Sequence, residues 1–381
     1  MSVLHRGSPR NFAFAFAAIL IAAGCNGGSG SGVTPPASQS MLSGTGVAGA
    51  GVSPDTSLLK QLTKQDVIGS VVDPVNGAGN PYGLTVAPIT SGLLTKGDLV
   101  VCNFNAKSGK QGTGRSIVAI HPAPGSSPTH VSSDKTLLGC DALALDGGDG
   151  VWAAAMVAND NPVLSSSGKL ITNISGKPFD QPWGQIYAET KAGSPAFYAT
   201  NAGTGTIVRI NLGSKFTYDV IGSGFPVNHG VPGTALAPSG LAYNASNDTL
   251  YFADGENNTV VAFKDVTKIP KGGIKAKNNG MSFSGPSAGD ASIVFSGTPL
   301  NGPISTALLP NGNLVVGNTL DPNGKNLMIE LSASGKLLDV RNVDKGASGA
   351  LFGIVATGTN DSNTKIYFND DNDNNLQVLE Q

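Results

Sequence analysis

The chain has 381 residues, of which 13% are charged and 40% hydrophobic, with 52 glycines and 23 prolines. This balance argues against disorder and against a helical bundle, and it favours a compact β protein rich in tight turns. The formal net charge is −2, and it becomes −2 − 2 = −4 if a leader that holds Arg6 and Arg10 but no acid is removed. A nucleic-acid-binding surface, which needs clustered Lys and Arg, is therefore not expected.

The first 24 residues are predicted to be an export signal. A basic start, MSVLHRGSPR, precedes the apolar run NFAFAFAAILIAAG, which is shorter than the about 20 residues that cross a bilayer as a helix. The run ends in LIAAGC, which resembles the bacterial lipoprotein signal and would make Cys25 the lipidated N-terminus. Ala22 stands where that signal usually has leucine, so cleavage by the ordinary signal peptidase is the alternative. Asn26 resembles the outer-membrane sorting pattern, and we expect an exported outer-membrane lipoprotein that faces the periplasm or the cell surface.

Residues 25–61 are rich in Gly, Ser and Pro, and they are predicted to be a flexible tether between the anchor and a folded domain. The protein would then contact the membrane only through its lipid. Residues 62–381 are predicted to form a single β-propeller domain.

From residue 62 onward, the same sequence pattern returns about six times. The repeats begin with the inner-strand segments PYGLTVAP, CDALALDG, PWGQIYAE, PSGLAYNA, PISTALLP and LFGIVATG. Each is followed by a second apolar run that closes on Asn, Asp or Gly, and then by further strands. Four-stranded units with a period of about 40–50 residues are typical of a β-propeller. The third position of the segments is small, as expected where backbones crowd: Gly83, Ala142, Gly184, Gly240, Ser305 and Gly353.

The two ends of the domain are predicted to meet in one blade. The last repeat stops after its third strand at Gln381, whereas the segment KQDVIGSVV before the first inner strand looks like the outer strand KFTYDVIGS. An N-terminal strand therefore closes the last blade of an all-β, six-bladed propeller with four antiparallel strands per blade. A longer interval, KIPKGGIKAKNNGMSFSGPSAGD, is predicted to be a surface insertion.

This pattern resembles the NHL-type six-bladed β-propeller, and the segment that carries the resemblance best is LYFADGENNTVVAFKD. The resemblance covers roughly residues 62–381. It implies the fold but not the activity, because the family includes scaffolds, ligand binders and enzymes.

Propeller ligands usually bind at the mouth of the central channel, where the inner strands begin. The aligned residues there are Tyr82, Asp141, Trp183, Ser239, Ile304 and Phe352. We predict that Tyr82, Trp183, Phe352 and Asp141 bind a small molecule or a carbohydrate, because aromatic rings stack on sugars and apolar groups. The alternative interpretation is that these rings fill the channel as core.

Two further chemistries are weaker candidates. Gluconolactonase-like propellers hold a divalent metal at this channel, but Asp141 is the only acid among the aligned positions, so we predict no metal ligands and no cofactor, with a cation such as calcium as the alternative. His229 lies in the loop FPVNHGVPG, where an imidazole could act as a general base. Asp141 and His229 are thus the catalytic candidates of a rival lactonase-like hydrolase or lyase, and a solvated loop histidine is the alternative for His229.

Two cysteines remain in the domain, and exported proteins retain disulfides. Cys102 falls near the end of a second strand and Cys140 near the start of the next inner strand, and both ends face the same side of a meander. We therefore predict a Cys102–Cys140 disulfide, with two buried thiols as the alternative. In function, the sequence predicts a binding module for a ligand or another envelope protein, with an enzyme or a structural scaffold as alternatives.

Overall fold

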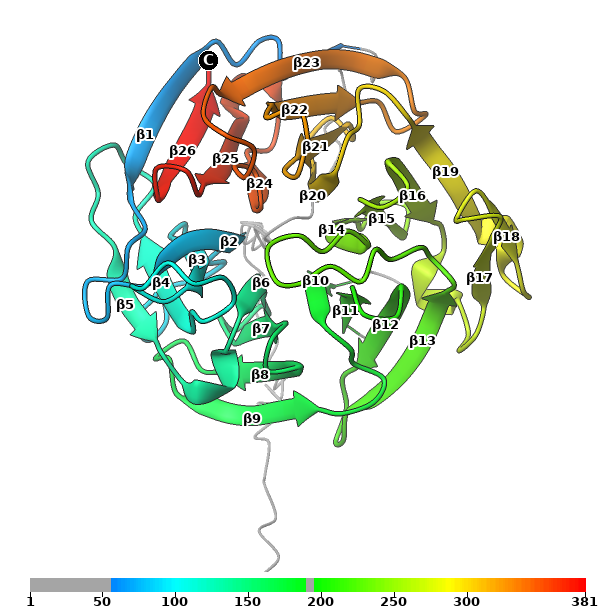
Figure 1. The fold of residues 1–381 in the computed structure, drawn as a ribbon, viewed down its shortest axis with the longest axis horizontal. Coiled ribbons are helices and arrows are strands. Elements are labelled where there is room, and N and C mark those ends of the chain that lie inside the picture. Colours follow the sequence, from blue (N-terminus) through cyan, green and yellow to red (C-terminus); the bar gives the residue numbers. More distant parts are fainter. Residues whose placement is uncertain (1–55, 190–194) are drawn as a thin grey trace, which may run out of the picture. The chain divides into compact units, whose positions relative to one another are not determined.

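The computed structural model describes residues 56–189 and 195–381, and in it six sheets form blades around a central axis (Figure 1). Each blade is an antiparallel meander whose first strand lies nearest the axis. This architecture confirms the predicted six-bladed propeller. Among the described residues, no helix has both the length and the apolar character needed to span a bilayer.

The strands of blades 1 to 3, from the axis outward, have the following bounds. Blade 1 contains β2 (Gly79–Val86), β3 (Leu99–Asn105), β4 (Ser116–Ile120) and β5 (Thr129–Ser132). Blade 2 contains β6 (Cys140–Leu145), β7 (Val151–Ala155), β8 (Asp160–Leu164) and β9 (Leu170–Ser175). Blade 3 contains β10 (Pro182–Ala188), β11 (Ala196–Asn201), β12 (Thr206–Asn211) and β13 (Thr217–Ser223).

Blades 4 to 6 follow the same order. Blade 4 contains β14 (Pro238–Asn244), β15 (Thr249–Asp254), β16 (Thr259–Phe263) and β19 (Ala291–Ser296). Blade 5 contains β20 (Pro303–Leu308), β21 (Leu314–Asn318), β22 (Asn326–Leu331) and β23 (Leu337–Asp344). Blade 6 contains β24 (Ile354–Thr357), β25 (Lys365–Asp370), β26 (Asn375–Glu380) and β1 (Lys64–Ser70).

The N-terminal strand closes the ring as predicted. β1 pairs antiparallel with β26, from Lys64 opposite Glu380 to Ser70 opposite Asn375. Blade 6 is therefore built from both ends of the domain, which leaves neither end with an unpaired strand edge at this junction.

The chain is already packed before Leu62, where the sequence places the start of the domain. Leu58, Leu59 and Leu62 are fully buried in a cluster shared with blades 5 and 6. The buried carboxylate of Glu330 accepts hydrogen bonds from the backbone N–H groups of Leu58 (3.1 Å) and Leu59 (2.8 Å) and from the Ser57 hydroxyl (2.6 Å). This contact ties the segment before β1 to blade 5.

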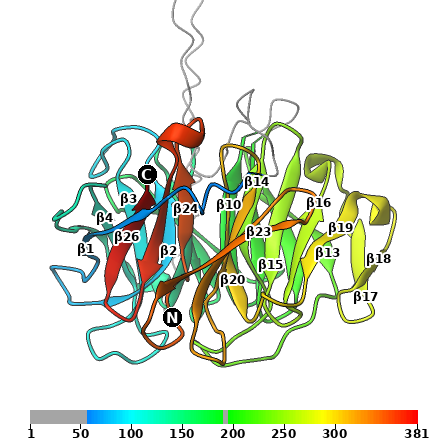
Figure 2. The same ribbon diagram turned by 90° about the horizontal axis from the view of Figure 1, so that it is seen from above.

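The predicted surface insertion folds into a hairpin at the outer edge of the ring (Figure 2). Its strands are β17 (Ile274–Lys277) and β18 (Ser282–Ser284), and β17 pairs in parallel with the outer strand of blade 3. The insertion lies in the chain within blade 4, so it joins two neighbouring blades.

The small residues of the inner strands lie where neighbouring blades approach each other most closely. A Cβ atom at Gly184 would lie 2.2 Å from the carbonyl oxygen of Ser239, and one at Gly353 would lie 2.4 Å from that of Tyr82. In five of the six blades, the inner strand also shifts register against its neighbour near this position. A β-bulge near the axis thus accompanies the close contact.

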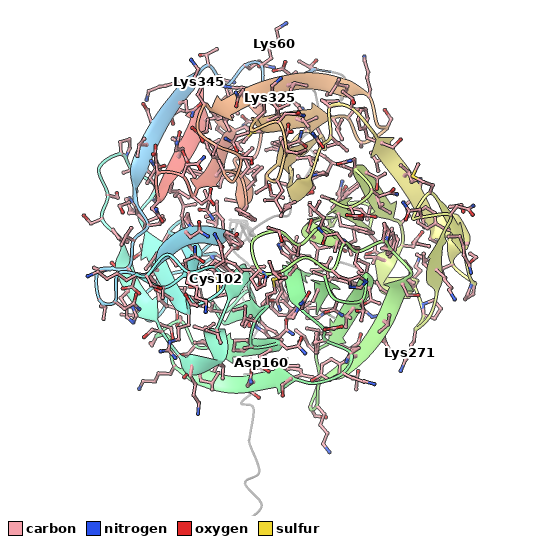
Figure 3. All side chains as sticks on the ribbon, viewed as in Figure 1. Lys60, Cys102, Asp160, Lys271, Lys325 and Lys345 are labelled. Atoms are coloured by element: carbon pink, nitrogen blue, oxygen red, sulfur yellow. A yellow bond between two sulfur atoms is a disulfide. The ribbon has the colours of Figure 1, made fainter. Side chains whose placement is uncertain are left out.

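Apolar side chains pack between the sheets in clusters that each join adjacent blades. Figure 3 shows side chains filling the ring, with charged residues such as Lys60 and Lys271 at its rim. In the same figure, Cys102 lies in the interior, within the cluster that joins blades 1 and 2. The core therefore lies between the sheets and leaves only a narrow axial space.

Candidate functional site

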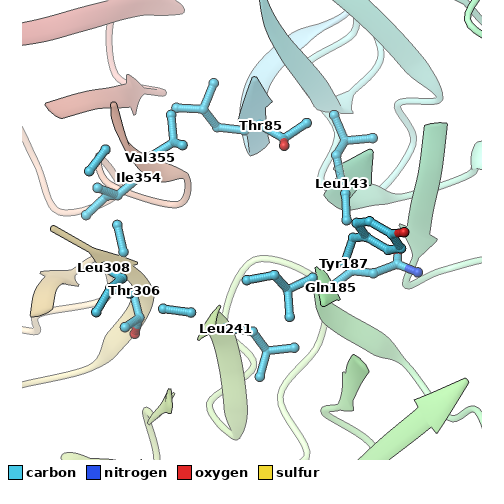
Figure 4. Close-up of a pocket in the computed structure, with 15 residues that line it drawn as sticks. Thr85, Leu143, Gln185, Tyr187, Leu241, Thr306, Leu308, Ile354 and Val355 are labelled. Carbon is cyan, nitrogen blue, oxygen red and sulfur yellow. The ribbon is translucent and has the colours of Figure 1, made fainter. Parts of the chain in front are cut away.

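The inner strands enclose a narrow axial channel with two adjoining cavities. Their volumes are about 60 Å³ and about 50 Å³. Six residues, one from each blade, line both cavities: Leu84, Leu143, Gln185, Leu241, Thr306 and Ile354. All of them except Leu84 are labelled around the opening drawn in Figure 4. A volume of this size holds a few water molecules, whereas pockets for drug-sized ligands measure about 300–1,000 Å³.

Three polar side chains of this channel make no hydrogen bond of good geometry among the described residues, although the backbone N–H groups of Asp141 and Ala142 lie near the Asp141 carboxylate. The polar atoms are both carboxylate oxygens of Asp141, both amide atoms of Gln185 and the hydroxyl of Thr306. All three residues are at least nine-tenths buried, and all three line the larger cavity. Because buried polar groups in folded proteins are nearly always hydrogen-bonded, these atoms are suited to bind water or a polar ligand in the channel.

Burial raises the pKa of Asp141 well above the ordinary value for aspartate. The backbone N–H groups of Asp141 and Ala142 lower the pKa and offset only part of this effect. The carboxyl group is therefore held in its neutral form over a wider pH range, in which it can donate a hydrogen bond as well as accept one.

The predicted aromatic residues lie together above the channel, but they are buried. Tyr82, Trp183 and Phe352 are 3%, 5% and 8% exposed, and they share a cluster with Phe104, Met156 and Ile304. The ring of Tyr82 stacks on Phe352 at 3.5 Å and on Phe104 at 4.2 Å between centroids. Both faces of Tyr82 are thus covered, which leaves no face for a ligand in this conformation.

A long loop between β13 and β14 covers this cluster. Residues 224–237, called the lid loop below, contribute Val227, Ala235 and Ala237 to the aromatic cluster. The tip of the loop reaches blade 1, where a Cβ atom at Gly233 would lie 3.1 Å from the Gln111 side chain. Figure 1 shows this segment crossing the centre of the ring toward β2. The lid loop therefore lies between the channel and the solvent on this side.

The other candidates from the sequence lie in different surroundings. His229 is on the lid loop with an exposed side chain, and no hydrogen bond or ion pair of its ring occurs among the described residues. Ser239 is fully buried, and its hydroxyl donates to the carbonyl of Ile304 at 2.8 Å. Asp141 lines the channel, whereas Cys25 lies outside the described residues.

Cys102 and Cys140 form a disulfide in the structure, with their Cα atoms 5.5 Å apart. The bond connects β3 of blade 1 to the start of β6 in blade 2, within the cluster that joins these blades. It is a structural crosslink near the channel wall.

Gln185 and Thr306 were not identified from the sequence. The signal was available, because these polar residues stand where the other four inner-strand segments carry Leu or Ile. The lid loop was also missed as a cover, since its contacts with blade 1 join residues far apart in the sequence. Among residues 56–189 and 195–381, no group of three or more His, Cys, Asp or Glu side chains is placed to hold a metal ion.

Comparison with known proteins gives a fold but no family. The sequence matches no protein-family profile, and no curated protein is similar enough to count as a relative. Solved structures do share the fold. A catalytically inactive virginiamycin B lyase from Staphylococcus aureus, solved with quinupristin, is 16% identical with a TM-score of 0.50, and the match covers 84% of this chain and 99% of the lyase.

A gluconolactonase from Xanthomonas campestris is 13% identical with a TM-score of 0.52, and the match covers 80% of this chain and 86% of that protein. A structure of a nidogen–laminin complex is 14% identical with a TM-score of 0.49, and the match covers 71% of this chain and 83% of the matched chain. At this level of identity the likeness shows the fold alone. The protein belongs to the class of six-bladed β-propellers, which hosts both enzymes and non-enzymatic proteins.

Proposed function

We propose that this protein is a propeller of the bacterial cell envelope that binds a small polar ligand, of the carbohydrate class, at the covered end of its channel. The observation that carries the proposal is the set of unpartnered polar groups on Asp141, Gln185 and Thr306 in one cavity. Hydroxyl groups of a sugar can both donate to and accept from such groups. The neighbouring apolar residues, Trp183 and Phe352 among them, supply the surface on which a sugar ring rests.

The closed cavity is too small for a whole sugar ring, so the ligand would enter with one polar end or after the lid loop has moved. Titrating the purified protein with a panel of monosaccharides and disaccharides, followed by tryptophan fluorescence, tests the proposal. Gln185→Leu should abolish binding without loss of stability, because its amide has no protein partner to lose. Gln61→Leu, at an exposed side chain of the segment before β1, is the matched control and should bind as wild type does. Binding that survives Gln185→Leu, or its absence across the panel, would overturn the proposal.

A hydrolase or lyase acting at the same channel is the alternative function. The neutral carboxyl of Asp141 could serve as an acid, and two of the matched structures are a lyase and a gluconolactonase. Turnover of a lactone or of a streptogramin antibiotic that is lost in Asp141→Asn would favour the enzyme. Turnover that is also lost when His229 is replaced would assign a catalytic role to this residue, whose side chain is exposed in this structure.

We also propose that Cys25 carries a lipid anchor and that the repeats are of the NHL type. The sequence LIAAGC supports the first proposal, and the strand–turn–strand over β15 and β16 agrees with the motif LYFADGENNTVVAFKD. Labelling of expressing cells with a palmitate analogue tests the anchor, because Cys25→Ala should lose the label. A labelled Cys25→Ala chain would exclude Cys25 as the attachment site.

A further inference from the structure

The backbone corners that lead into the inner strands of blades 3, 4 and 5 share one sequence pattern. The segments are GKPFD (176–180), GFPVN (224–228) and GTPLN (297–301). The second strand of each blade ends beside its corner, on Asn201 in blade 3, Asp254 in blade 4 and Asn318 in blade 5. These three positions are thus structural equivalents that differ in side-chain chemistry.

In blades 3 and 5, the asparagine fastens its corner with two hydrogen bonds. Asn201 donates to the carbonyl of Pro178 at 2.9 Å and accepts from the N–H of Asp180 at 3.3 Å. Asn318 donates to the carbonyl of Pro299 at 2.7 Å and accepts from the N–H of Asn301 at 3.0 Å. An amide group can do both because it carries a donor and an acceptor.

Blade 4 has neither bond, although its corner is the first part of the lid loop. Both carboxylate oxygens of Asp254 are buried without a hydrogen bond of good geometry among the described residues, and the side chain is 0% exposed. The backbone N–H groups of Glu256 and Asn257 lie near the carboxylate, but neither belongs to the lid loop. The backbone N–H group of Asn228 instead donates a hydrogen bond within the lid loop, to the carbonyl oxygen of Leu236 at 3.0 Å. An ionised carboxylate has no proton to donate, so Asp254 can fasten the lid loop as an asparagine does only when it is protonated.

The lid loop lies close to Asp254. A Cβ atom at Gly280, in the turn of the β17–β18 hairpin, would lie 3.2 Å from Pro226 of the lid loop and 3.4 Å from the Oδ2 atom of Asp254. These three residues therefore meet at one point, and opening the loop would let water reach the carboxyl group.

Among the described residues, no cationic side chain lowers the pKa of Asp254. Burial raises the pKa of Asp254 to about 7, and the charge of Glu256 adds to this, whereas the backbone N–H groups of Asn257 and Glu256 lower it. The lid loop contributes His229 as its only titratable side chain, which is exposed and does not act on Asp254. The hairpin turn at residues 278–281 has no titratable residue, and Lys277 before it is exposed.

We propose that Asp254 is a proton-operated latch that holds the lid loop over the ligand channel. This inference rests on the proposed binding function, because it assigns the control of access to that site. With Asp254 neutral, the loop stays closed over the aromatic cluster. When the proton leaves, the buried carboxylate favours an open loop in which it is hydrated, and the channel becomes accessible to a ligand.

Hydrogen exchange of peptides that cover residues 224–237 tests the latch without any ligand. In the wild type, the exchange rate divided by the intrinsic rate reports the population of the open loop. This population should increase between about pH 5 and about pH 7, by up to tenfold per pH unit, and should level off above pH 7. Asp254→Asn should keep the loop protected at every pH, because its amide is neutral and can donate as Asn201 and Asn318 do. Equal pH profiles for wild type and Asp254→Asn would overturn the proposal.

The chain offers a matched control in blade 3. Asn201→Asp places the same carboxyl group against the corner at 176–180, and this segment should acquire the pH-dependent exchange that the wild type shows only in the lid loop. A lid loop whose exchange follows pH while no saccharide binds at any pH would leave the latch standing and refute the binding function. A pH-independent loop together with saccharide binding would refute the latch alone.

Discussion

Gly184 in blade 3 lies so close to Ser239 in blade 4 that a Cβ atom on Gly184 would be 2.2 Å from the Ser239 carbonyl oxygen. The same approach recurs between Gly353 and Tyr82, so the inner strands contact each other through backbone rather than side chains. This contact sets the narrow width of the channel.

Gly184→Ala should therefore destabilise the protein, because the backbone of Ser239 has no room to move without shifting a second blade. The expected loss is at least about 1–3 kcal/mol in the free energy of unfolding. Gly147→Ala is the control, since a Cβ atom there meets nothing within 4 Å. Denaturant unfolding of both variants measures the difference, and an equal stability of the two would show that the blades are not in rigid contact.

Glu330→Ala should release the segment before β1. It leaves the N–H groups of Leu58 and Leu59 and the amide of Asn313 without their common acceptor, and the expected loss is about 3–5 kcal/mol. Glu380→Ala should cost far less, because Glu380 makes ion pairs with Lys64 and Lys365 at the surface. Limited proteolysis near residue 57 should speed up only in Glu330→Ala, and unchanged cleavage would contradict the clamp.

The double variant Cys102→Ala, Cys140→Ala should lose the crosslink between blades 1 and 2. For a sequence separation of 38 residues, the loss of loop-closure entropy in the unfolded chain corresponds to about 3–4 kcal/mol. Thermal unfolding compares the variant with wild type. Intact mass before and after reduction and alkylation checks the bond itself, and two alkylated thiols in the unreduced, denatured wild type would refute it.

Asp141→Asn should remove a pH dependence of stability. The folded-state pKa of Asp141 is raised, so the unfolded chain releases its proton at a lower pH than the folded chain does. Stability from this group is full below the ordinary aspartate pKa and is lost as pH rises toward the folded-state pKa. The melting temperature of the variant should thus exceed that of wild type most at about pH 8 and least at about pH 4.

The control for this prediction is Asp339→Asn on the outer strand β23, which should change with pH as wild type does. If the melting temperature of Asp141→Asn changes with pH as that of wild type does, the prediction is wrong, and the carboxyl group of Asp141 is hydrated or paired in solution.

Trp183→Ala should lower the free energy of unfolding by about 3–5 kcal/mol, because the indole is buried among Tyr82, Phe352 and Ile304. Calorimetry of the variant decides between the two interpretations of the aromatic residues. A variant that keeps its melting temperature but loses saccharide affinity would assign Trp183 to the site and not to the core.

Local sequence determined most of this fold. Alternation of apolar residues and turn residues is a short-range property, so the strands, the six repeats and the small residues such as Gly184 could be located without a structure. The likeness of KQDVIGSVV to KFTYDVIGS was enough to predict that β1 closes the last blade, since equivalent strands occupy equivalent places in a ring.

Which residues line the channel and what covers them could be learned only from the tertiary structure. Gln185 and Thr306 line the channel together with Asp141 and Trp183, although the alignment drew attention only to the residues at the start of the inner strands. The lid loop covers the aromatic residues through contacts with blade 1 that no local pattern records. Strand formation is decided by neighbours in the chain, whereas a channel and its cover are decided by which distant segments the closed ring brings together.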